Sequence, residues 1–136
     1  MLDRYHGKRT VLLASQDGRL LRWIRKRANG YPTSLSVLEN IWTLLKLSDK
    51  DLKGIALQTS YALIPSEEFV SELKARGCAV HVFLTGFGFF FPALDAKPRT
   101  PKKTEVFRIL DMGVDGIMTD RPSRVRKLMD DWISQR

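Results

Sequence analysis

The stretch Gly113–Pro122, Gly-Val-Asp-Gly-Ile-Met-Thr-Asp-Arg-Pro, constrains the fold more than any other part of the chain. A helical segment over Thr104–Met112 precedes it, and glycine at position 113 can end that helix because it adopts the left-handed conformation without a Cβ clash. Gly116–Thr119 is a short apolar run between turn signals, which predicts a buried parallel strand. Asp120 follows at the carboxyl end, before a proline-led final helix. This order predicts a β/α unit of an open α/β sheet or of a (β/α)8 barrel.

The same alternation runs through the rest of the chain. Cys78–Leu84 is the clearest strand, a continuous β-rich run that suits coverage on both faces. Within it, Cys78 is interpreted as a buried small hydrophobe, and His81 as buried, hydrogen-bonded and inert. Ser36-x-x-Glu39 has the spacing of a capping box and predicts a helix with Val37, Leu38, Ile41, Leu44 and Leu45 on its apolar face. The other predicted strands are Val11–Ser15, Tyr31–Leu35 and Ile55–Thr59.

For two helices, the spacing of apolar residues predicts which side chains face the core. In the helix over Arg19–Ala28, the inner face would hold Leu20, Leu21, Ile24 and Ala28, and the opposite, solvated face Arg19, Arg22, Arg25, Lys26 and Arg27. In the final helix, Pro122–Ser134, the inner face would hold Val125, Leu128, Met129, Trp132 and Ile133. Both patterns are typical of helices docked outside a sheet.

Length and charge bound the class of protein. The 136 residues allow one ordinary domain, whereas a (β/α)8 barrel typically needs about 250 residues. With about four to five β/α units, residues 1–136 are predicted to be a single partial domain. The net charge of +8 favours anionic partners. We find no signal-peptide pattern and no apolar run of about eighteen residues, so we expect a cytoplasmic chain.

The amino-acid sequence of Gly113–Pro122 closely resembles that of the closing strand in the glycerophosphodiester phosphodiesterase family. Weaker resemblances lie upstream, in Ala56-Leu57-Gln58 before Ile64–Val70 and in Lys74–Gly77 before Val80–Val82. Val11–Ser15 is similar to the family's fifth strand, although this chain continues Gln-Asp where the family has Phe-Asp. The resemblance spans roughly Thr10 to Trp132. It implies an α/β chain of alternating β/α units that forms the C-terminal half of a (β/α)8 barrel.

The resemblance also implies a reaction. Family members hydrolyse glycerophosphodiesters to an alcohol and glycerol 3-phosphate, usually with a divalent cation, Ca²⁺ or Mg²⁺. Their catalytic histidine pair and metal-binding Glu and Asp residues belong to the first half of the barrel and match nothing here. His6-Gly-Lys lacks the preceding strand and the acidic pair. We therefore expect no catalytic residue and no metal ligand in this chain, and a need for the N-terminal half from elsewhere. A dimer of half barrels could cover the sheet edges but would still lack the histidines.

Four residues are candidates for a substrate pocket, because a barrel binds its substrate at the carboxyl ends of its strands. Gln58 lies at the C-terminal end of the predicted strand Ile55–Thr59, although a simple strand-exit residue is an equally good interpretation. Phe83 keeps the aromatic character of a Trp in the family's Trp-Thr-Val-Asn motif, whose Asn position has become Gly86. Thr119 and Asp120 end the closing strand. Asp120 is predicted to cap the final helix and could also touch the site.

The connection from Gly86 to Lys103 is unusually long for a βα loop. We expect a lid or membrane-docking loop in which phenylalanines enter the acyl boundary and cations meet anionic head groups. That would suit a glycerophosphodiester or lysophospholipid-like substrate and an anionic membrane surface as partner. Alternatively, the phenylalanines cover core surface. The residues concerned are Phe87, Phe89, Phe90, Phe91, Lys97, Arg99, Lys102 and Lys103.

Two other interpretations stay open: a catalytically inactive fragment, or a small basic α/β module that binds phosphate ligands or nucleic acid. Neither a Gly-x-Gly-x-x-Gly nor a Walker-type loop is present, and no RNA- or DNA-binding motif. We therefore expect no nucleic-acid partner. Salt-dependent binding to nucleic acid would discriminate this alternative from the enzyme hypothesis.

Overall fold

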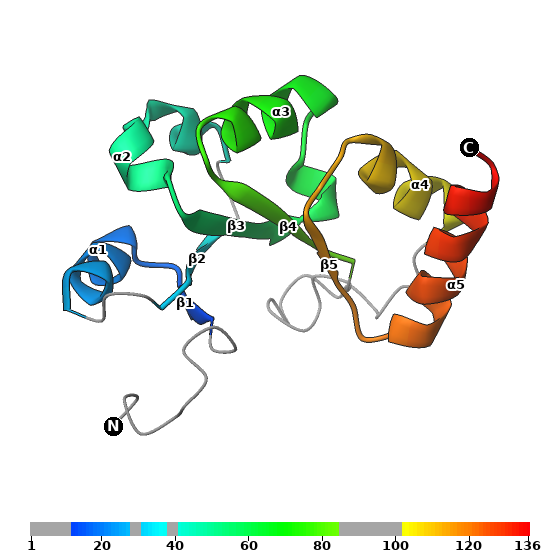
Figure 1. The fold of residues 1–136 in the computed structure, drawn as a ribbon, viewed down its shortest axis with the longest axis horizontal. Coiled ribbons are helices and arrows are strands. Elements are labelled where there is room, and N and C mark those ends of the chain that lie inside the picture. Colours follow the sequence, from blue (N-terminus) through cyan, green and yellow to red (C-terminus); the bar gives the residue numbers. More distant parts are fainter. Residues whose placement is uncertain (1–11, 28–30, 38–40, 85–101) are drawn as a thin grey trace, which may run out of the picture.

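The computed structural model describes residues 12–27, 31–37, 41–84 and 102–136. Strands and helices alternate along the chain (Figure 1). The elements are β1 (Leu13–Ser15), α1 (Gly18–Arg27), β2 (Thr33–Val37), the 3-10 helix η2 (Ile41–Lys46), α2 (Asp49–Leu52), β3 (Ile55–Ser60), the 3-10 helix η3 (Tyr61–Leu63), α3 (Glu67–Ala75), β4 (Ala79–Phe83), α4 (Lys103–Asp111), β5 (Gly116–Met118) and α5 (Pro122–Ser134).

The five strands form one parallel sheet in the sequential order β1-β2-β3-β4-β5. Each strand therefore pairs with the next strand along the chain, and a helical segment crosses over between them. Sequential parallel pairing of this kind is the strand arrangement of a (β/α)8 barrel wall. The predicted α/β alternation is confirmed. Among the described strands, β1 and β5 each have a partner on one side.

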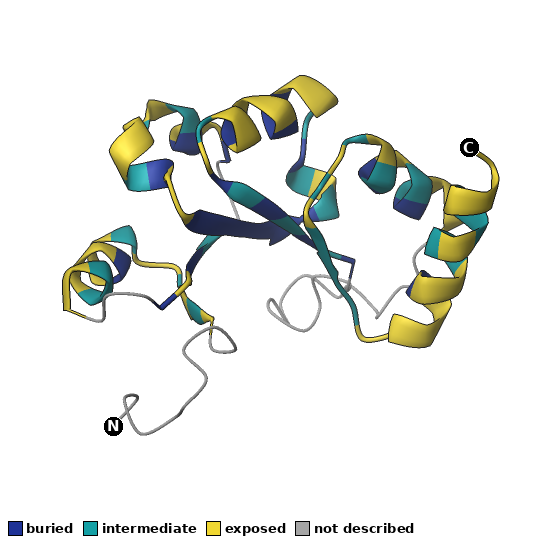
Figure 2. Cartoon of the chain, viewed as in Figure 1, coloured by how far each residue is buried: buried dark blue, intermediate teal, exposed yellow. Residues whose placement is uncertain are grey.

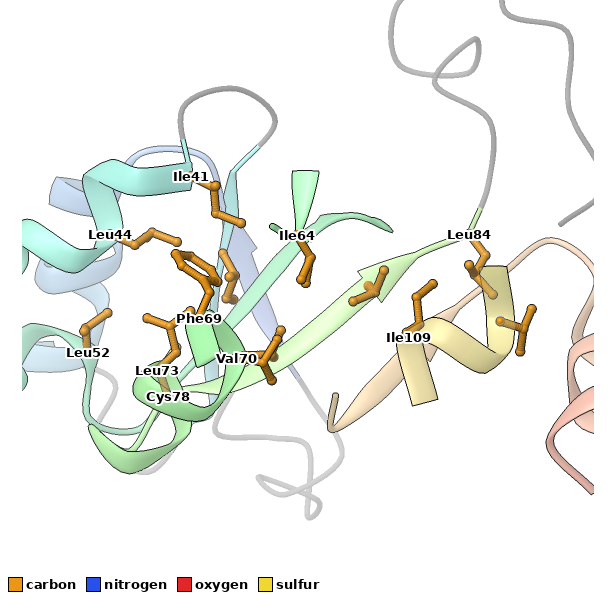
Figure 3. Packing of buried hydrophobic residues seen from close by; sticks show 14 of the residues in the cluster. Ile41, Leu44, Leu52, Ile64, Phe69, Val70, Leu73, Cys78, Leu84 and Ile109 are labelled. Atoms are coloured by element: carbon orange, nitrogen blue, oxygen red, sulfur yellow. The ribbon is translucent and has the colours of Figure 1, made fainter. Parts of the chain in front are cut away.

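The hydrophobic core lies between the sheet and the helices on one of its faces. Leu57 of β3 and Val80 and Val82 of β4 are fully buried, and α3 covers this face with Val70 and Leu73. Figure 3 shows Phe69, Val70 and Leu73 of α3 in one cluster with Ile41, Leu44 and Leu52, and Ile109 of α4 with Leu84 at the other end of that cluster. The outward surfaces of the same helices are exposed, whereas β3 is buried along its whole length (Figure 2). We call the helix-covered side the helix face and the other side the concave face.

The predicted helix start at Ser36 is wrong. Ser36 lies within β2, and the next described helical residues are those of η2, from Ile41. The Ser36 hydroxyl donates a hydrogen bond across to the Gln58 side chain on β3, at 3.2 Å, instead of capping a helix. Glu39 lies outside the described residues. Pairing of β2 with β3 over five register positions therefore overrides the local capping pattern.

Helix α1 has a different buried face from the predicted one. Leu21 is buried, but Leu20 is 46% exposed. Arg25 is half-buried rather than solvated, because its guanidinium donates to the main-chain carbonyls of Asp51 and Lys53 at 3.2 and 2.6 Å. These carbonyls belong to the C-terminal end of α2, where a cation is favourable. One of the five basic residues predicted for the outer face is therefore a tether between α1 and α2.

Helix α5 keeps the predicted bounds, but its last turn does not bury the predicted residue. Val125 is buried and Ile133 is 62% exposed. Trp132 anchors this end differently, since its indole Nε1 donates to the Asp111 carboxylate of α4 at 2.9 Å. Arg136 stacks on the Trp132 ring at 4.3 Å and also contacts Asp111. The polar pairing of α5 with α4 explains why the apolar stripe ends before Ile133.

The free cysteine behaves as predicted. Cys78 is buried in the core cluster immediately before β4. Burial raises the pKa of its thiol, because the charged thiolate is poorly solvated there. The residue therefore contributes as a small apolar side chain with low expected reactivity.

Candidate functional site

The concave face carries two rows of side chains that follow from strand register. Ser36 pairs with Gln58, Gln58 with His81, and His81 with Gly116. Because registered residues of neighbouring parallel strands point to the same side, these four positions form one row across β2 to β5. We call it the polar row. Successive side chains alternate between faces, so the polar row lies opposite the core residues Leu57, Val80 and Val82.

The second row lies one layer closer to the carboxyl ends of the strands. Ser60 pairs with Phe83, and Phe83 pairs with Met118. We call this the upper row. Phe83, predicted to line the pocket, therefore lies on the concave face at the end of β4. In a barrel these carboxyl ends surround the site of chemistry.

No charged side chain lies on the concave face of the described strands. The face is made of small, polar uncharged and apolar residues. They are Ala14, Ser34, Ser36, Ala56, Gln58, Ser60, Ala79, His81, Phe83, Gly116 and Met118. Ser34 is satisfied within the sheet, because its hydroxyl donates to the Ala56 carbonyl at 2.9 Å. This part of the wall can therefore offer hydrogen bonds but no cation to a ligand.

Gln58 is the most informative residue of the polar row. Its exposed fraction is only 7%, and its Oε1 accepts the Ser36 hydroxyl at 3.2 Å. Within the described part of the chain, no group accepts a hydrogen bond from its Nε2. Nε2 is therefore a donor that a ligand, a water or another segment can use. The predicted pocket residue Gln58 thus lies on the face that a substrate would reach.

His81 differs from its prediction. It is half-buried rather than buried, and no hydrogen bond of its imidazole is formed with the residues that the structure describes. The ring lies against β5, where a Cβ on Gly116 would come within 2.8 Å of its Cδ2 atom and 3.3 Å of its Nε2. Only glycine leaves room for this ring. Sequence reasoning missed this pairing, because the two residues become neighbours only through the register of β4 and β5.

Thr119 and Asp120 follow the end of β5, as predicted, but the predicted cap is wrong. The N-cap position of α5 belongs to Arg121, and no side chain makes a cap hydrogen bond there. The Thr119 hydroxyl instead accepts the Arg121 main-chain N–H at 3.0 Å. Asp120 is exposed. Proline at the first turn of α5 removes one donor that a cap would otherwise satisfy.

The acidic residues near the strands serve the fold. Asp17 caps α1 by accepting the Arg19 main-chain N–H at 2.8 Å, and this hydrogen bond holds the pKa of its carboxyl below the usual value. Asp115 lies at the opposite edge of the sheet, where it accepts the Val80 N–H at 2.9 Å and pairs with Lys74 at 3.0 Å. Both carboxylates are engaged in contacts that support the fold.

A divalent cation needs several converging oxygen ligands. In residues 12–27, 31–37, 41–84 and 102–136, no three His, Cys, Asp or Glu side chains gather in this way. The described residues therefore do not fit the cation that the family resemblance implies. Asp120 is a single exposed carboxylate at the strand ends.

The predicted lid or membrane loop falls largely outside the described residues: Phe87, Phe89, Phe90, Phe91, Lys97 and Arg99. Two of its basic residues are described. Lys102 precedes α4 and its main-chain N–H bonds the Glu105 carboxylate at 2.9 Å, while Lys103 lies over the Phe107 ring at 4.9 Å. None of the helices that the described residues form is long and apolar enough to cross a membrane.

A hollow of about 560 Å³ lies between β5 and α5. Asp115, Gly116 and Ile117 line it from the strand, and Val125 and Met129 from the helix. Another, of about 640 Å³, lies among α3, α4 and the end of α5. The second hollow is removed from the concave face. The first runs along the edge strand of the sheet, where a further strand of a barrel would pair.

Sequential parallel β/α units with a polar concave face define part of a (β/α)8 barrel wall. The comparisons agree. The glycerophosphoryl diester phosphodiesterase family matches residues 1–124, and the chain belongs to this family. Among curated proteins, none matches. Among solved structures, a protein from Silicibacter pomeroyi assigned to the glycerophosphoryl diester phosphodiesterases is similar at 21% identity, with a TM-score of 0.70. The similarity covers 96% of this chain and 41% of that one, so this chain spans about two fifths of its length. At this identity the likeness supports the fold.

Proposed function

We propose that the chain serves as the C-terminal part of a phosphoric diester hydrolase that converts glycerophosphodiesters to an alcohol and glycerol 3-phosphate. Family membership over residues 1–124 is the observation that carries this proposal. The polar and upper rows support it, because they line the concave face near the carboxyl ends of the strands, where barrels bind substrate. In this role the chain supplies one wall of the substrate pocket through Gln58, Phe83, Thr119 and Asp120.

The acid–base chemistry and the metal would come from other units of the barrel. The described residues hold no acidic cluster, and the one histidine among them, His81, lies without a carboxylate partner. We propose that the complete barrel uses Ca²⁺ or Mg²⁺ and that its ligands lie outside the described residues. On this proposal the isolated chain binds substrate weakly and does not turn it over.

The partner we propose is the set of remaining β/α units of the same barrel. Both edge strands of the sheet, β1 and β5, lie beside surface on which further β/α units could pack. Leu12, Leu20 and Trp23 are 40%, 46% and 53% exposed near β1, and the hollow beside β5 lies at the other end. Exposed apolar surface at a sheet edge favours pairing. A second copy would bring another net charge of +8, whereas a segment rich in metal-binding carboxylates would complement it.

Sequencing the genomic DNA upstream of the Met1 codon tests the proposal first. We expect a segment that encodes a His-Arg after a strand, a Glu-x-Asp and a second histidine. The longest product containing residues 1–136 should then release glycerol 3-phosphate from glycerophosphocholine with Mg²⁺ or Ca²⁺. Residues 1–136 alone serve as the inactive control. No release from the longest product with either cation would contradict the proposed reaction.

Replacement of Phe83 tests the pocket in the active protein. Phe83→Ala should lower kcat/KM by about tenfold or more, because it removes an aromatic wall at the strand ends. The matched control is Phe107→Ala, since Phe107 lies on α4 under Lys103 and away from the concave face. Equal effects of the two substitutions would argue against a pocket role for Phe83.

An anionic membrane surface and a cytoplasmic location remain predictions. Sedimentation with phosphatidylserine-containing liposomes tests the first: replacing Phe89 and Phe90 with Ser should reduce it if these residues dock. For the alternative of nucleic-acid binding, the exposed basic residues Arg22, Lys26 and Arg27 of α1 are the relevant surface. Tight, salt-dependent binding of DNA or RNA would favour that alternative.

A further inference from the structure

We propose that the polar row binds the hydroxyl groups at the glycerol end of the substrate through Ser36, Gln58 and His81, with the His81 ring packed against Gly116. This inference rests on the proposed function and assigns a specificity role to residues that the reaction chemistry does not use. It makes His81 a substrate-contacting residue rather than an inert one. The polar row would decide which alcohol phosphate is accepted, and other groups would carry the phosphodiester cleavage.

The first argument is the hydrogen-bonding inventory. Gln58 is 7% exposed, and its Oε1 is occupied by the Ser36 hydroxyl at 3.2 Å. The amide Nε2 remains a donor for which the described residues provide no acceptor. The neighbouring His81 imidazole offers one donor and one acceptor when neutral, and the described chain leaves both without a hydrogen bond. The row thus presents at least two donors and one acceptor, the complement of a pair of hydroxyls.

The second argument is charge. Phosphate oxygens are held best by Arg, Lys, metal ions or clustered main-chain N–H groups. The concave face of the described strands has no Lys, Arg, Asp or Glu. Neutral amide and hydroxyl groups match alcohol hydroxyls, which donate and accept in turn. The row therefore favours the polyol end of the ligand over its phosphate.

The third argument is depth. Gln58 precedes Ser60 along β3, and His81 precedes Phe83 along β4, so the polar row lies one layer below the upper row. Substrate that enters at the carboxyl ends of the strands reaches the upper row first. On this proposal a small polyol extends past Phe83 to the polar row, while the phosphate stays nearer the strand ends. The order of the two rows thus orients the ligand with its hydroxyls inward.

Gly116 is the element that makes the row possible. A Cβ at this position would lie 2.8 Å from Cδ2 and 3.3 Å from both Cγ and Nε2 of His81. A larger residue would push the imidazole off β5 and change where its nitrogen atoms lie. Gly116 is therefore a positioning residue for His81.

A binding experiment on residues 1–136 tests the proposal. The chain has two histidines, so a His6→Gln variant carries His81 alone, and the ¹⁵N shifts of its imidazole report binding directly. The probes are glycerol 3-phosphate and n-propyl phosphate, which differ only in two hydroxyl groups. We expect glycerol 3-phosphate to shift the His81 signals saturably and to bind at least about tenfold more tightly than n-propyl phosphate.

Variants locate the effect. Gln58→Leu should reduce the preference for glycerol 3-phosphate to about threefold or less and leave binding of n-propyl phosphate unchanged. Gln135→Leu is the matched control, because Gln135 is exposed beyond α5 and should keep the full preference. Ser36→Ala removes one hydroxyl only and should give an intermediate preference, which keeps the test available if Gln58→Leu does not fold.

The outcomes separate this inference from the proposed function. Equal binding of the two probes, or the absence of any His81 shift, would overturn the hydroxyl-binding row even in a protein that hydrolyses glycerophosphodiesters. A clear preference for glycerol 3-phosphate in a protein whose longest product releases none would instead support the row and contradict the hydrolase proposal.

Discussion

The two faces of the sheet have opposite characters although they belong to the same strands. On the helix face, Leu57, Val80 and Val82 are fully buried beneath helices of the chain itself. On the concave face, the same two strands present Gln58 and His81, and the neighbouring β5 contributes Gly116. One face is therefore completed by apolar packing within the chain. The other carries hydrogen-bonding groups that the described residues leave partly unsatisfied.

This contrast separates stability from function. Apolar burial contributes roughly 25 cal/mol per Å² and needs no partner beyond the helices, so the helix face should govern folding. On the concave face, Gln58 Nε2 and the His81 imidazole form no hydrogen bond with the described residues and are available to a ligand. Substitutions on the first face should therefore change the free energy of unfolding, and substitutions on the second should mainly change ligand binding.

The largest expected effect is on the helix face. Leu73 of α3 is fully buried, so Leu73→Ala should lower the free energy of unfolding by about 2–5 kcal/mol through lost burial and a cavity. Leu20→Ala is the matched control, because Leu20 is 46% exposed and should cost well under half as much. Urea unfolding followed by circular dichroism measures both. Similar costs at the two positions would mean that the helix face is not the dominant core.

The next effect concerns the contact between β4 and β5 on the concave face. Gly116→Ala should cost about 1–3 kcal/mol, because the new Cβ would lie 2.8 Å from the His81 ring. His81→Ala should relieve most of that cost in the double variant, which a double-mutant cycle by urea unfolding would show. Gly18→Ala is the control, since its Cβ would meet nothing within 4 Å. Additive costs of Gly116→Ala and His81→Ala would rule out the contact.

A smaller effect distinguishes the two acids of the Gly113–Pro122 stretch. Asp115→Ala should cost about 1–2 kcal/mol, because it removes the acceptor for the Val80 N–H and a partly exposed pair with Lys74. Asp120→Ala should change the free energy of unfolding by no more than about 0.5 kcal/mol, since Asp120 is exposed and makes no cap. Thermal unfolding of both variants measures the difference. The reverse ranking would show that Asp120, not Asp115, supports the fold.

The smallest effect is a pH dependence at the edge strand. The Arg19 main-chain N–H holds the pKa of Asp17 below its usual value, so the ionised carboxylate stabilises the folded chain. That contribution is present above the pKa of the unfolded state, about 3.9, and is lost as the pH falls through the lower folded pKa. Asp17→Asn should therefore lower Tm slightly at pH 7, and the gap should close in the acid range. A gap that widens on acidification would contradict the capping role.

Much of the local structure could be predicted from the sequence. The final helix was predicted over Pro122–Ser134 and has these bounds, and the preceding helix differs by one residue at each end. Gly113 has a φ of 71°, the left-handed conformation predicted for the residue after a helix. These successes rest on signals that lie within a few residues of one another: apolar periodicity, a helix-ending glycine and a proline at the first turn.

The failures have a common cause. Ser36 has a good local capping pattern, but pairing of β2 with β3 places it in a strand and turns its hydroxyl toward Gln58. Asp120 precedes a helix at a capping distance, yet Thr119 takes the nearby main-chain N–H instead. In both cases several local arrangements were chemically acceptable, and packing chose among them. The local sequence alone therefore does not predict which of these arrangements Ser36 and Asp120 adopt.

The sequence by itself determined the order of strands and helices, the apolar helix face and membership of residues 1–124 in the phosphodiesterase family. Only the tertiary structure decided which side chains share the concave face. Ser36 and Gln58 are 22 positions apart, and His81 meets Gly116 through the register of β4 with β5. Register depends on how two strands align over their whole length and against the helices that cover them. Local propensities act over a few residues, so they determine each strand but leave the neighbours of Gln58 and His81 to the packing of the sheet.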